Sequence, residues 1–524
     1  MSIRVRFAPS PTGNVHIGNI RAAIFNWLFA RNQGGSFLLR VEDTDRERST
    51  QDAIDKLREV MDWMGLDIDE DVLYQSQRAD AHIAAAEQLL TENKAYRYAK
   101  GEGGEATLFR IPWNAPDFDF VREAGKQELI LHPDSTSRFS FSGFEYSVVS
   151  KKGKAVPQEA CLAGFHDLKL FDADGQCIFE LNAKIDAILA GETIEIPSAV
   201  KAEFTRHEIF FEDLVKGEMA KPLDSMKDLV IVRSDGSPVF HLANICDDNY
   251  QEITHIIRGD DHVENSYRHI FLLNALAYTV PHYAHLPMIV NAQGKPFSKR
   301  DGDAYVGDFR AKGFTADALM NALALLGWSP GDDREKMSRE ELIAAFSLKR
   351  VKATPAQLDM SKLYYINGQY MDELDDDVFL AGAKQTLVGE SWYEDSEKLQ
   401  QVAVLMKSRC KVYPDVLGWG YFFSADFEIE EKLYNKNLAK EGVAEILNSV
   451  SAALADCDFL NAEAIENCLH QVAESADVKT GKVNLPLRLA STGTNAGADL
   501  NQTLQIIGKE EVTKRIQTLI NKLS

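Results

Sequence analysis

Two different spacings of apolar side chains follow one another at the start of the chain. Apolar and charged residues alternate over 3–7, which is the period of a β-strand. Pro9 and Pro11 cannot donate to a sheet ladder, so the strand must end there. Gly34 and Gly35 predict the end of a helix, and "SFLLRVED" reads as a second strand. The helix between them is predicted by apolar residues at spacings of three and four: Ile17, Ile20, Ile24 and Leu28.

Strand, glycine-containing loop, helix and strand together predict a βαβ unit. The N-terminus of its helix is a favourable place for an anion, because backbone N–H groups and the helix dipole face it. The loop reads "APSPTGNVHIGN" rather than the G-x-G-x-x-G of dinucleotide enzymes, which disfavours NAD and FAD. A phosphate-bearing ligand is therefore the expectation.

The spacing of apolar residues then changes twice along the chain. Helical spacing continues over 49–65, where an S-x-x-D start is expected, and over 79–93. From residue 101 to about 212, short alternating segments such as "FSFSGFEYSVV" are separated by Asp-Gly and Lys-Gly turns, which predicts an inserted β-rich module. "LVIVRSDGSPVFHLANI" then looks like a hairpin with its turn at Asp235 and Gly236. After Gly313 nearly everything has helical spacing, so the outline is an α/β domain, an insert and an α-helical C-terminal third.

Length and composition limit the class of protein. A chain of 524 residues is too long for one core, and 45% hydrophobic with 26% charged residues is ordinary for soluble globular protein. There is neither an apolar run long enough to span a bilayer nor a secretory signal, so a cytoplasmic location and no membrane partner are expected. The six cysteines include no C-x-x-C pair, so we expect reduced thiols and no structural zinc.

The net charge of −23 disfavours non-specific binding to nucleic acid, because like charges repel at long range. It leaves room for a nucleic-acid partner held by local basic patches. "LKRVK" at 348–352 and "MKSRCK" at 406–411 are such patches, although either could equally be a solvated helix face.

Two loops carry the residues that could bind a triphosphate. The first, "PSPTGNVHIGN", places His16 at a helix N-terminus, and the second, "GKPFSKRDG" at 294–302, places Lys295, Lys299 and Arg300 around Ser298. Taken alone, the second loop is more simply an exposed basic turn. Both loops in one α/β chain favour a nucleotide held from two sides, with charge neutralised as it develops.

These loops resemble the HIGH and KMSKS signatures of class I aminoacyl-tRNA synthetases. Other blocks, such as "LLRVEDTDRERS", "ITHIIRGDDHVENSYRHIFLLNALAY" and "LPLRLASTGTNAGADL", are similar to the glutamyl-tRNA synthetase family. The resemblance covers 1–100 and 211–370 well and the helical C-terminal part more loosely. It implies a Rossmann-type catalytic domain over 1–100 and 212–302, an inserted connective or acceptor-end module over 101–211, a stem-contact region over 303–370 and a helical anticodon-binding region over 371–524.

The resemblance also implies a two-step reaction. The α-carboxylate of L-glutamate attacks the α-phosphorus of ATP, and the glutamyl group then passes to the 2′-hydroxyl of the terminal adenosine of tRNA(Glu). Catalysis would consist mainly of positioning and charge neutralisation, with Mg²⁺ accompanying ATP and no permanent metal site. His16 would contact the phosphates, and Lys299 would stabilise the charge on the departing pyrophosphate. These two are the catalytic residues that the resemblance implies.

The remaining site residues follow from the same matched blocks. Arg6 and Arg258 would meet substrate carboxylates, where a planar guanidinium fork suits better than lysine, and Glu42 would lie near the ammonium group. An Arg near the last anticodon base would be Arg409, although an ordinary surface Arg would look the same in the sequence. The rest of the glutamate pocket would be Ala8, Ser10, Phe240 and Asn244. The ATP-binding set would be Gly13, His16, Gly18, Asn19, Pro296, Phe297, Ser298, Lys299 and Arg300.

The chain departs from the family pattern in three places. Pro296 stands where the family usually has Lys, and Phe240 stands where it commonly has Tyr. The stretch after "AYR" has none of the cysteine zinc ligands that some members carry, so contacts of the insert with the tRNA end cannot be transferred to this chain.

Four related functions compete with a glutamate-specific synthetase. A glutaminyl-tRNA synthetase should have a β-barrel C-terminal region, and a glutamyl-queuosine-type relative should lack the C-terminal third. A non-discriminating enzyme that also charges tRNA(Gln) and a degenerate synthetase-like binding protein are compatible with the same residues. A monomer is expected, while the role of the insert and the need for tRNA during activation are not predicted.

Overall fold

A computed structural model describes most of the chain in two units. The first unit comprises Met1–Gly307 and Leu323–Leu358, and the second comprises Asp308–Ala322 and Asp359–Ser524. Each unit has its own core and is described separately below. The residues described are 2–11, 13–44, 49–99, 104–291, 293–297, 304–394 and 396–523.

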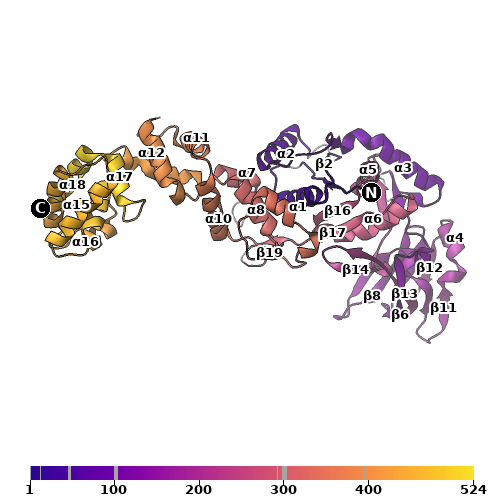
Figure 1. Cartoon of the computed structure of the whole chain (residues 1–524). Coiled ribbons are helices and arrows are strands. Elements are labelled where there is room, and N and C mark those ends of the chain that lie inside the picture. Colours follow the sequence, from indigo (N-terminus) through magenta and orange to yellow (C-terminus); the bar gives the residue numbers. More distant parts are fainter. Residues whose placement is uncertain are drawn as a thin grey trace. The chain divides into compact units, whose positions relative to one another are not determined.

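Parallel strands form the centre of the first unit (Figure 1). Strand β1 (Arg4–Phe7) and strand β2 (Ser36–Val41) pair in parallel across helix α1 (Ile17–Gln33), which confirms the predicted βαβ unit. β2 also pairs in parallel with β3 (Leu73–Tyr74). On the other side of β1, the Thr254 N–H donates to the Arg4 carbonyl at 2.9 Å, next to strand β16 (His255–Gly259). β16 pairs in parallel with β17 (His282–Leu286), so the direction of winding reverses between β1 and β16.

Helix α1 begins and ends where the sequence predicts. His16 is its N-cap and Gly34, with φ 63°, is its C-cap. All four residues of the predicted apolar face are fully buried. Helix α2 (Gln51–Met64) starts one residue later than expected, because the Thr50 side chain rather than that of Ser49 caps it. The other helices beside these strands are α3 (Ala79–Thr91), α5 (Phe240–Tyr250) and α6 (Val263–Ala275).

The predicted hairpin over 229–245 is wrong in its second arm. Strand β15 (Leu229–Val232) is followed by the expected turn, but only an isolated bridge joins Val232 to Pro238 before α5 begins at Phe240. The sequence from Phe240 onward buries residues on several sides of a helix, which an alternating strand pattern does not fit. As a result Phe240 and Asn244 lie one helical turn apart on the same face.

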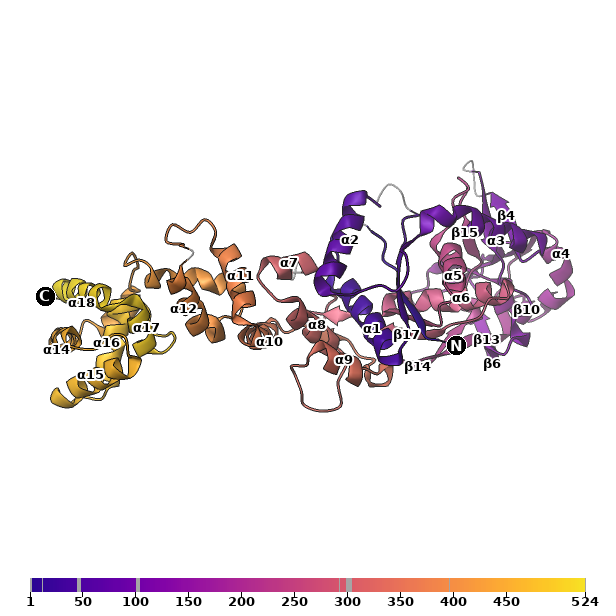
Figure 2. The same ribbon diagram turned by 45° about the horizontal axis from the view of Figure 1, so that its top comes forward.

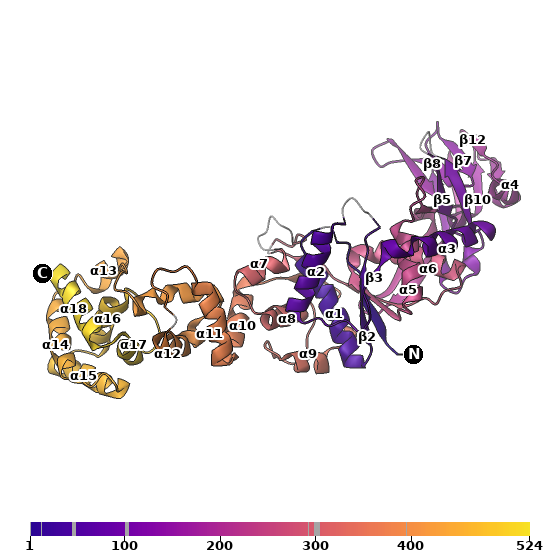
Figure 3. The same ribbon diagram turned by 90° about the horizontal axis from the view of Figure 1, so that it is seen from above.

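The β-rich segment predicted between the halves of this unit is present (Figure 3). It joins the parallel core through the pairing of its longest strand. Its longest strand, β13 (Lys201–Asp213), pairs with β6, β10 and β14, and its last residue pairs with Tyr283 of β17. One sheet thus runs from this segment into the parallel strands. The other strands are β4 (Ala95–Ala99), β5 (Glu105–Phe109), β6 (Val121–Ile130), β7 (Thr136–Ser140), β8 (Gly143–Val149), β9 (Ala155–Ala160), β10 (His166–Phe171), β11 (Cys177–Glu180), β12 (Ile194–Pro197) and β14 (Gly217–Pro222).

The second unit is helical and has its own apolar core, as the spacing after Gly313 predicts (Figure 2). Trp419 and Phe422 are among its most buried side chains. Its helices are α10 (Met360–Glu373), α11 (Asp376–Leu387), α12 (Glu397–Met406), α13 (Glu431–Asn437), α14 (Val443–Ala455), α15 (Ala462–Ser475), α16 (Gly481–Thr492), α17 (Leu500–Ile507) and α18 (Lys509–Leu523).

The division between the units falls near short helices. Helix α7 (Val306–Ala311) and helix α8 (Ala316–Leu325) each have residues in both units, and α9 (Arg339–Ala345) belongs to the first. None of the helices in the described part of the chain is long and apolar enough to cross a membrane.

The start of β2 offers a test of the packing between β1 and β2. A Cβ at Gly35 would lie 2.4 Å from the Ile3 carbonyl oxygen, and backbone cannot move aside as a flexible side chain can. We expect Gly35→Ala to destabilise the first unit by about 1–3 kcal/mol, measured by thermal or urea unfolding. Gly307→Ala is the matched control, because a Cβ there meets nothing within 4 Å. Equal stability of the two variants would contradict this account of the strand start.

Candidate functional site

A cleft of about 690 Å³ lies at the carboxyl ends of the parallel strands. Ala8 follows β1, Glu42 follows β2, Asp260 follows β16 and Pro287 follows β17, and all four line it. This is where open α/β sheets bind ligands, at the point where the winding reverses. The predicted site residues that the structure brings together here are Arg6, Ala8, Ser10, His16, Gly18, Asn19, Glu42, Phe240, Asn244, Arg258, Pro296 and Phe297.

A few predicted residues are not among those that line the cleft. Gly13 is described, with φ 136°, but does not line it. Arg409 belongs to the second unit, where it is exposed. Burial lowers the pKa of the neighbouring Arg488 guanidinium, and the charge of Arg409 acts in the same direction, against Tyr421 and Asp499. Ser298, Lys299 and Arg300 lie outside the described residues.

The first loop uses its polar groups to close the start of α1. The Gly18 N–H donates to His16 Nδ1 at 3.1 Å, the Ile17 N–H to the Ala304 carbonyl at 2.9 Å, and the Asn19 N–H to the His16 carbonyl at 3.0 Å. A phosphate at this end would therefore meet the helix dipole and the imidazole rather than these three N–H groups. Burial lowers the pKa of His16, against a hydrogen bond to the Phe297 backbone, so the ring is neutral at pH 7.

The residues that precede and follow 298–303 in the second loop both bond to the first loop, close to His16. On one side the Phe297 N–H donates to the Ile289 carbonyl and the Phe297 backbone bonds His16. On the other side Ala304 accepts from Ile17, and the Val306 N–H donates to the Val15 carbonyl. The two loops that the sequence separates so widely therefore meet beside the His16 imidazole.

Arg258 is a buried cation of this cleft. Its side chain is 7% exposed, and burial lowers its pKa to about 10, so it stays charged at pH 7. It donates to the hydroxyl of Ser266 and the carbonyl of His262, and no carboxylate of the described residues pairs with it. A buried charge of this kind is costly unless a partner neutralises it, so the geometry suits an anionic ligand.

The cleft also contains hydrogen-bond acceptors, which suit a ligand that carries a positive group as well as a negative one. Asn244 Nδ2 donates to Glu42 Oε1 at 2.8 Å, while Asn244 Oδ1 is buried and has no hydrogen-bond donor within the described residues. Burial raises the pKa of Glu42, against the favourable field of Arg40 and Arg6. A ligand N–H group would satisfy the unpaired acceptor of Asn244, and a ligand cation would stabilise the Glu42 carboxylate.

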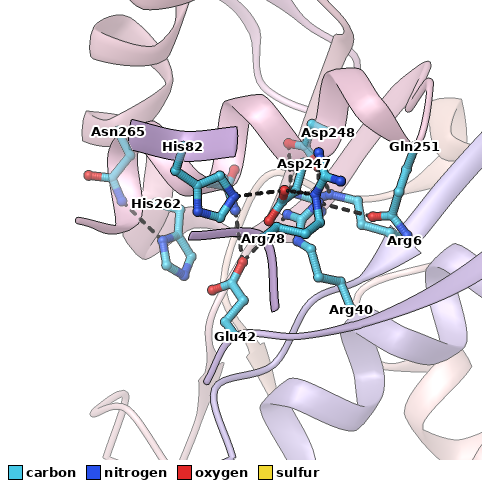
Figure 4. A network of polar contacts seen from close by, with 11 residues as sticks. Arg6, Arg40, Glu42, Arg78, His82, Asp247, Asp248, Gln251, His262 and Asn265 are labelled. Atoms are coloured by element: carbon cyan, nitrogen blue, oxygen red, sulfur yellow. Dashed lines mark hydrogen bonds and ion pairs between the residues drawn. The ribbon is translucent and has the colours of Figure 1, made fainter. Parts of the chain in front are cut away.

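Sequence reasoning missed the residues that hold Arg6 in place (Figure 4). Asp248 Oδ1 accepts from Arg6 Nε at 2.9 Å and from Arg40 Nη1 at 2.6 Å, and Arg40 is fully buried. Burial alone would raise the pKa of Asp248, but Arg40 and Arg6 hold it below its usual value. Arginine in the middle of the apolar "SFLLRV" strand and the acidic pair in "ICDD" were the available signals.

A second group of ion pairs lies beside the first. Asp247 Oδ1 accepts from Arg78 Nε at 2.7 Å and lies 2.8 Å from His82 Nε2. These contacts join α5 to the start of α3. Within the described residues, no group of three or more His, Cys, Asp and Glu is arranged to hold a metal ion. Further residues that line the cleft and were not predicted are Arg21, Asp260, Asp261, His262 and Asn265.

Comparisons with known proteins agree with this architecture. The family described as "tRNA synthetases class I (E and Q), catalytic domain" matches residues 2–103 and 181–365. The family described as "Anticodon binding domain" matches 378–520, within the helical unit. The parallel sheet, the cleft at its carboxyl edge and the separate helical unit are thus those of a class I synthetase.

Full-length relatives narrow the class further. "Glutamate--tRNA ligase 1" of Gluconobacter oxydans is 34% identical, over 99% of this chain and 98% of its own length. "Glutamate--tRNA ligase" of Neisseria meningitidis serogroup A is also 34% identical, over 99% of this chain and all of its own. A crystal structure of a glutamate tRNA ligase from Elizabethkingia meningosepticum, in complex with its amino acid, superposes with a TM-score of 0.74 at 27% identity and covers both chains fully. The chain belongs to the class I tRNA synthetases for glutamate and glutamine, in the family of the glutamate–tRNA ligases.

Asp248 offers a test of the ion-pair network. Asp248→Asn leaves two buried guanidinium groups without their shared carboxylate, so we expect the free energy of unfolding to fall by about 3–5 kcal/mol. Urea unfolding at pH 7 measures it. Glu70→Gln is the control. Glu70 pairs at 2.7 Å with Arg4, which lies on β1 as Arg6 does, but the Glu70 side chain is 46% exposed. The control should cost less than about 1 kcal/mol. A cost for Asp248→Asn as small as that of the control would refute the account.

Proposed function

We propose that this chain ligates L-glutamate to tRNA(Glu) at the expense of ATP. In the first step the α-carboxylate of glutamate attacks the α-phosphorus of ATP, which forms glutamyl-adenylate and releases pyrophosphate. In the second step the 2′-hydroxyl of the terminal adenosine of the tRNA attacks the glutamyl carbonyl and displaces AMP. The observation that carries the proposal is Arg258, a buried guanidinium with no carboxylate partner in the described part of the chain.

Glutamate suits the polar groups of the cleft. One carboxylate would pair with Arg258, and the ammonium group would lie between Glu42 and the unpaired Oδ1 of Asn244. Glutamine would bring a neutral amide to Arg258 and leave its charge without a counter-ion. Arg6 is already neutralised in part by Asp248, so Arg258 is the better candidate for distinguishing a charged side chain from a neutral one.

ATP would occupy the part of the cleft near His16. We assign to the Nε2–H of the neutral His16 ring a hydrogen bond to a phosphate, which would replace its bond to the Phe297 backbone, because Nδ1 accepts from the Gly18 N–H. To Lys299 we assign the stabilisation of the departing pyrophosphate. The glycine at position 18 leaves room for the His16 ring in this position. A Cβ there would lie 3.3 Å from Nδ1 and push the ring. Mg²⁺ would arrive with ATP, held mainly by phosphate oxygens.

The tRNA would use the rest of the chain. We assign 1–100 and 212–302 to catalysis, 303–370 to the stem and 371–524 to the anticodon, with 101–211 as a connective or acceptor-end module. Arg409 and the neighbouring Arg488 are the candidates for anticodon contact, since guanidinium groups suit both phosphates and base edges. A cytosolic monomer is the form in which we propose that it works.

Isotope exchange between ATP and pyrophosphate tests the reaction itself. We expect exchange with glutamate and none with glutamine or the other amino acids, measured with and without purified tRNA(Glu) and tRNA(Gln). Support by tRNA(Glu) alone would establish a discriminating enzyme, and support by either tRNA would establish a non-discriminating one. Absence of exchange in every combination would reject the proposed function in favour of a synthetase-like binding protein.

Substitution of Arg258 tests the assigned pairing with a carboxylate. Arg258→Ala should raise the KM for glutamate by about a hundredfold or more, because a buried charge pair loses one partner. The KM for ATP should stay within about twofold, since the phosphates bind elsewhere in the cleft. Arg122→Ala, on β6 with a side chain 40% exposed, is the control. A parallel rise of both KM values would point to damaged folding and contradict the assigned role.

A further inference from the structure

A chain of buried hydrogen bonds runs from Arg258 to three residues that do not line the cleft. Arg258 Nη2 donates to Ser266 Oγ at 2.7 Å, and Ser266 Oγ lies 3.0 Å from His285 Nε2. His285 Nδ1 lies 2.6 Å from Asp213 Oδ2. Ser266 and His285 are fully buried, Asp213 is 2% exposed, and none of the three lines the cleft. They come from three elements, α6, β17 and the end of β13.

The direction of each hydrogen bond in this chain is determined by Asp213. Its carboxylate accepts from the backbone N–H groups of Val215, Lys216 and His285, and its hydrogen bond to the His285 ring helps to hold its pKa below the usual value despite burial. An ionised carboxylate only accepts, so His285 Nδ1 carries the proton.

A neutral ring with its proton on Nδ1 has an acceptor at Nε2. That nitrogen faces two donors, the Ser266 hydroxyl and Arg258 Nε at 3.4 Å. The hydroxyl could also turn to the His262 carbonyl, but at 3.5 Å that contact is longer. Burial lowers the pKa of His285 although the Asp213 hydrogen bond opposes it, which keeps Nε2 free of a proton.

This arrangement orients the guanidinium of Arg258. Its Nη2 and Nε are engaged by Ser266 and His285, while Nη1 has no hydrogen-bond partner in the part of the chain that the structure describes. An arginine side chain has several rotatable bonds, and tight binding of a carboxylate requires its fork to be held in one orientation before the ligand arrives.

We propose that Asp213, His285 and Ser266 are positioning residues that hold Arg258 ready to bind a carboxylate of the amino-acid substrate. The inference rests on the proposed function and extends it. It assigns a role to Asp213, the last residue of the long strand β13, which links the β-rich segment to the core. The effect should appear in glutamate binding and not in ATP binding.

Removal of the Ser266 hydroxyl is the first test. Ser266→Ala should raise the KM for glutamate about tenfold, since a hydrogen bond to a charged group is lost. The kcat and the KM for ATP should change less than about twofold. The rise in unfolding temperature that glutamate produces should shrink in parallel. Ser135→Ala is the matched control, because Ser135 is also buried and donates to the Ala199 carbonyl at 3.2 Å, within the β-rich segment.

Two replacements of His285 separate positioning from simple stabilisation. Asn places an amide near the Nδ1 position and can still donate to Asp213, but it offers no acceptor to Ser266 and Arg258. Gln places its amide near the Nε2 position and can supply that acceptor. We expect His285→Gln to keep a glutamate KM at least about fivefold lower than that of His285→Asn. A purely structural role for the Asp213 pairing would make His285→Asn the milder variant.

The outcomes distinguish failure of this inference from failure of the proposed function. No glutamate-dependent exchange by the unmodified enzyme would reject the proposed function and the positioning role with it. Normal exchange by the unmodified enzyme, with an unchanged glutamate KM in Ser266→Ala, would reject only the positioning role. A KM for ATP that rises as much as the KM for glutamate, or a milder effect of His285→Asn, would also overturn it.

Discussion

Two arginines on neighbouring parallel strands, Arg6 of β1 and Arg40 of β2, share a single buried carboxylate. That carboxylate, Asp248, belongs to α5, far along the sequence and beyond the whole β-rich segment. Guanidinium groups in an apolar sheet are tolerated only when they are neutralised, so the first strands and α5 must assemble together. The rest of the catalytic unit depends on this constraint, because α5 also carries Asn244, which lines the same cleft as Arg258.

The charges of the site divide between those that stabilise the fold and those that remain for a ligand. Asp248 is the shared counter-ion of Arg6 and Arg40, and Asp247 pairs with Arg78. Arg258 instead donates only to neutral partners among the described residues: Ser266, His285 and the His262 carbonyl. A neutral partner orients a cation without satisfying its charge, which leaves the electrostatic energy available to a substrate carboxylate. Pairing every arginine internally would give a more stable protein with a weaker site.

The long strand β13 gives the β-rich segment a direct connection to this chemistry. Its pairings with β6, β10 and β14 belong to the segment, whereas its last residue lies beside β17 and bonds His285. The helical unit differs, because its apolar core is built from its own helices. This organisation agrees with two separate family matches, one to a catalytic and one to an anticodon-binding domain.

The sequence by itself determined the elements whose signals are local. Alternation over β1, the proline stop and the apolar spacing of α1 are each encoded within a few neighbouring residues, and so is the capping glycine at position 34. Matched blocks then identified Arg6, Glu42, Asn244 and Arg258 as residues of one site. Their roles in the reaction still stand as predictions.

Only the tertiary structure decided how these residues are held. Asp248 pairs with Arg6, and Asp213 pairs with His285. In each pair the two residues are far apart in the sequence, so no periodic signal predicts them. The second arm of the expected hairpin became α5 because its burial depends on neighbours that the local alternation does not contain. Spacing along the chain reports which face of an element is apolar. Which cation meets which carboxylate is decided by long-range packing, because such pairs form only when distant elements are brought within a few ångströms.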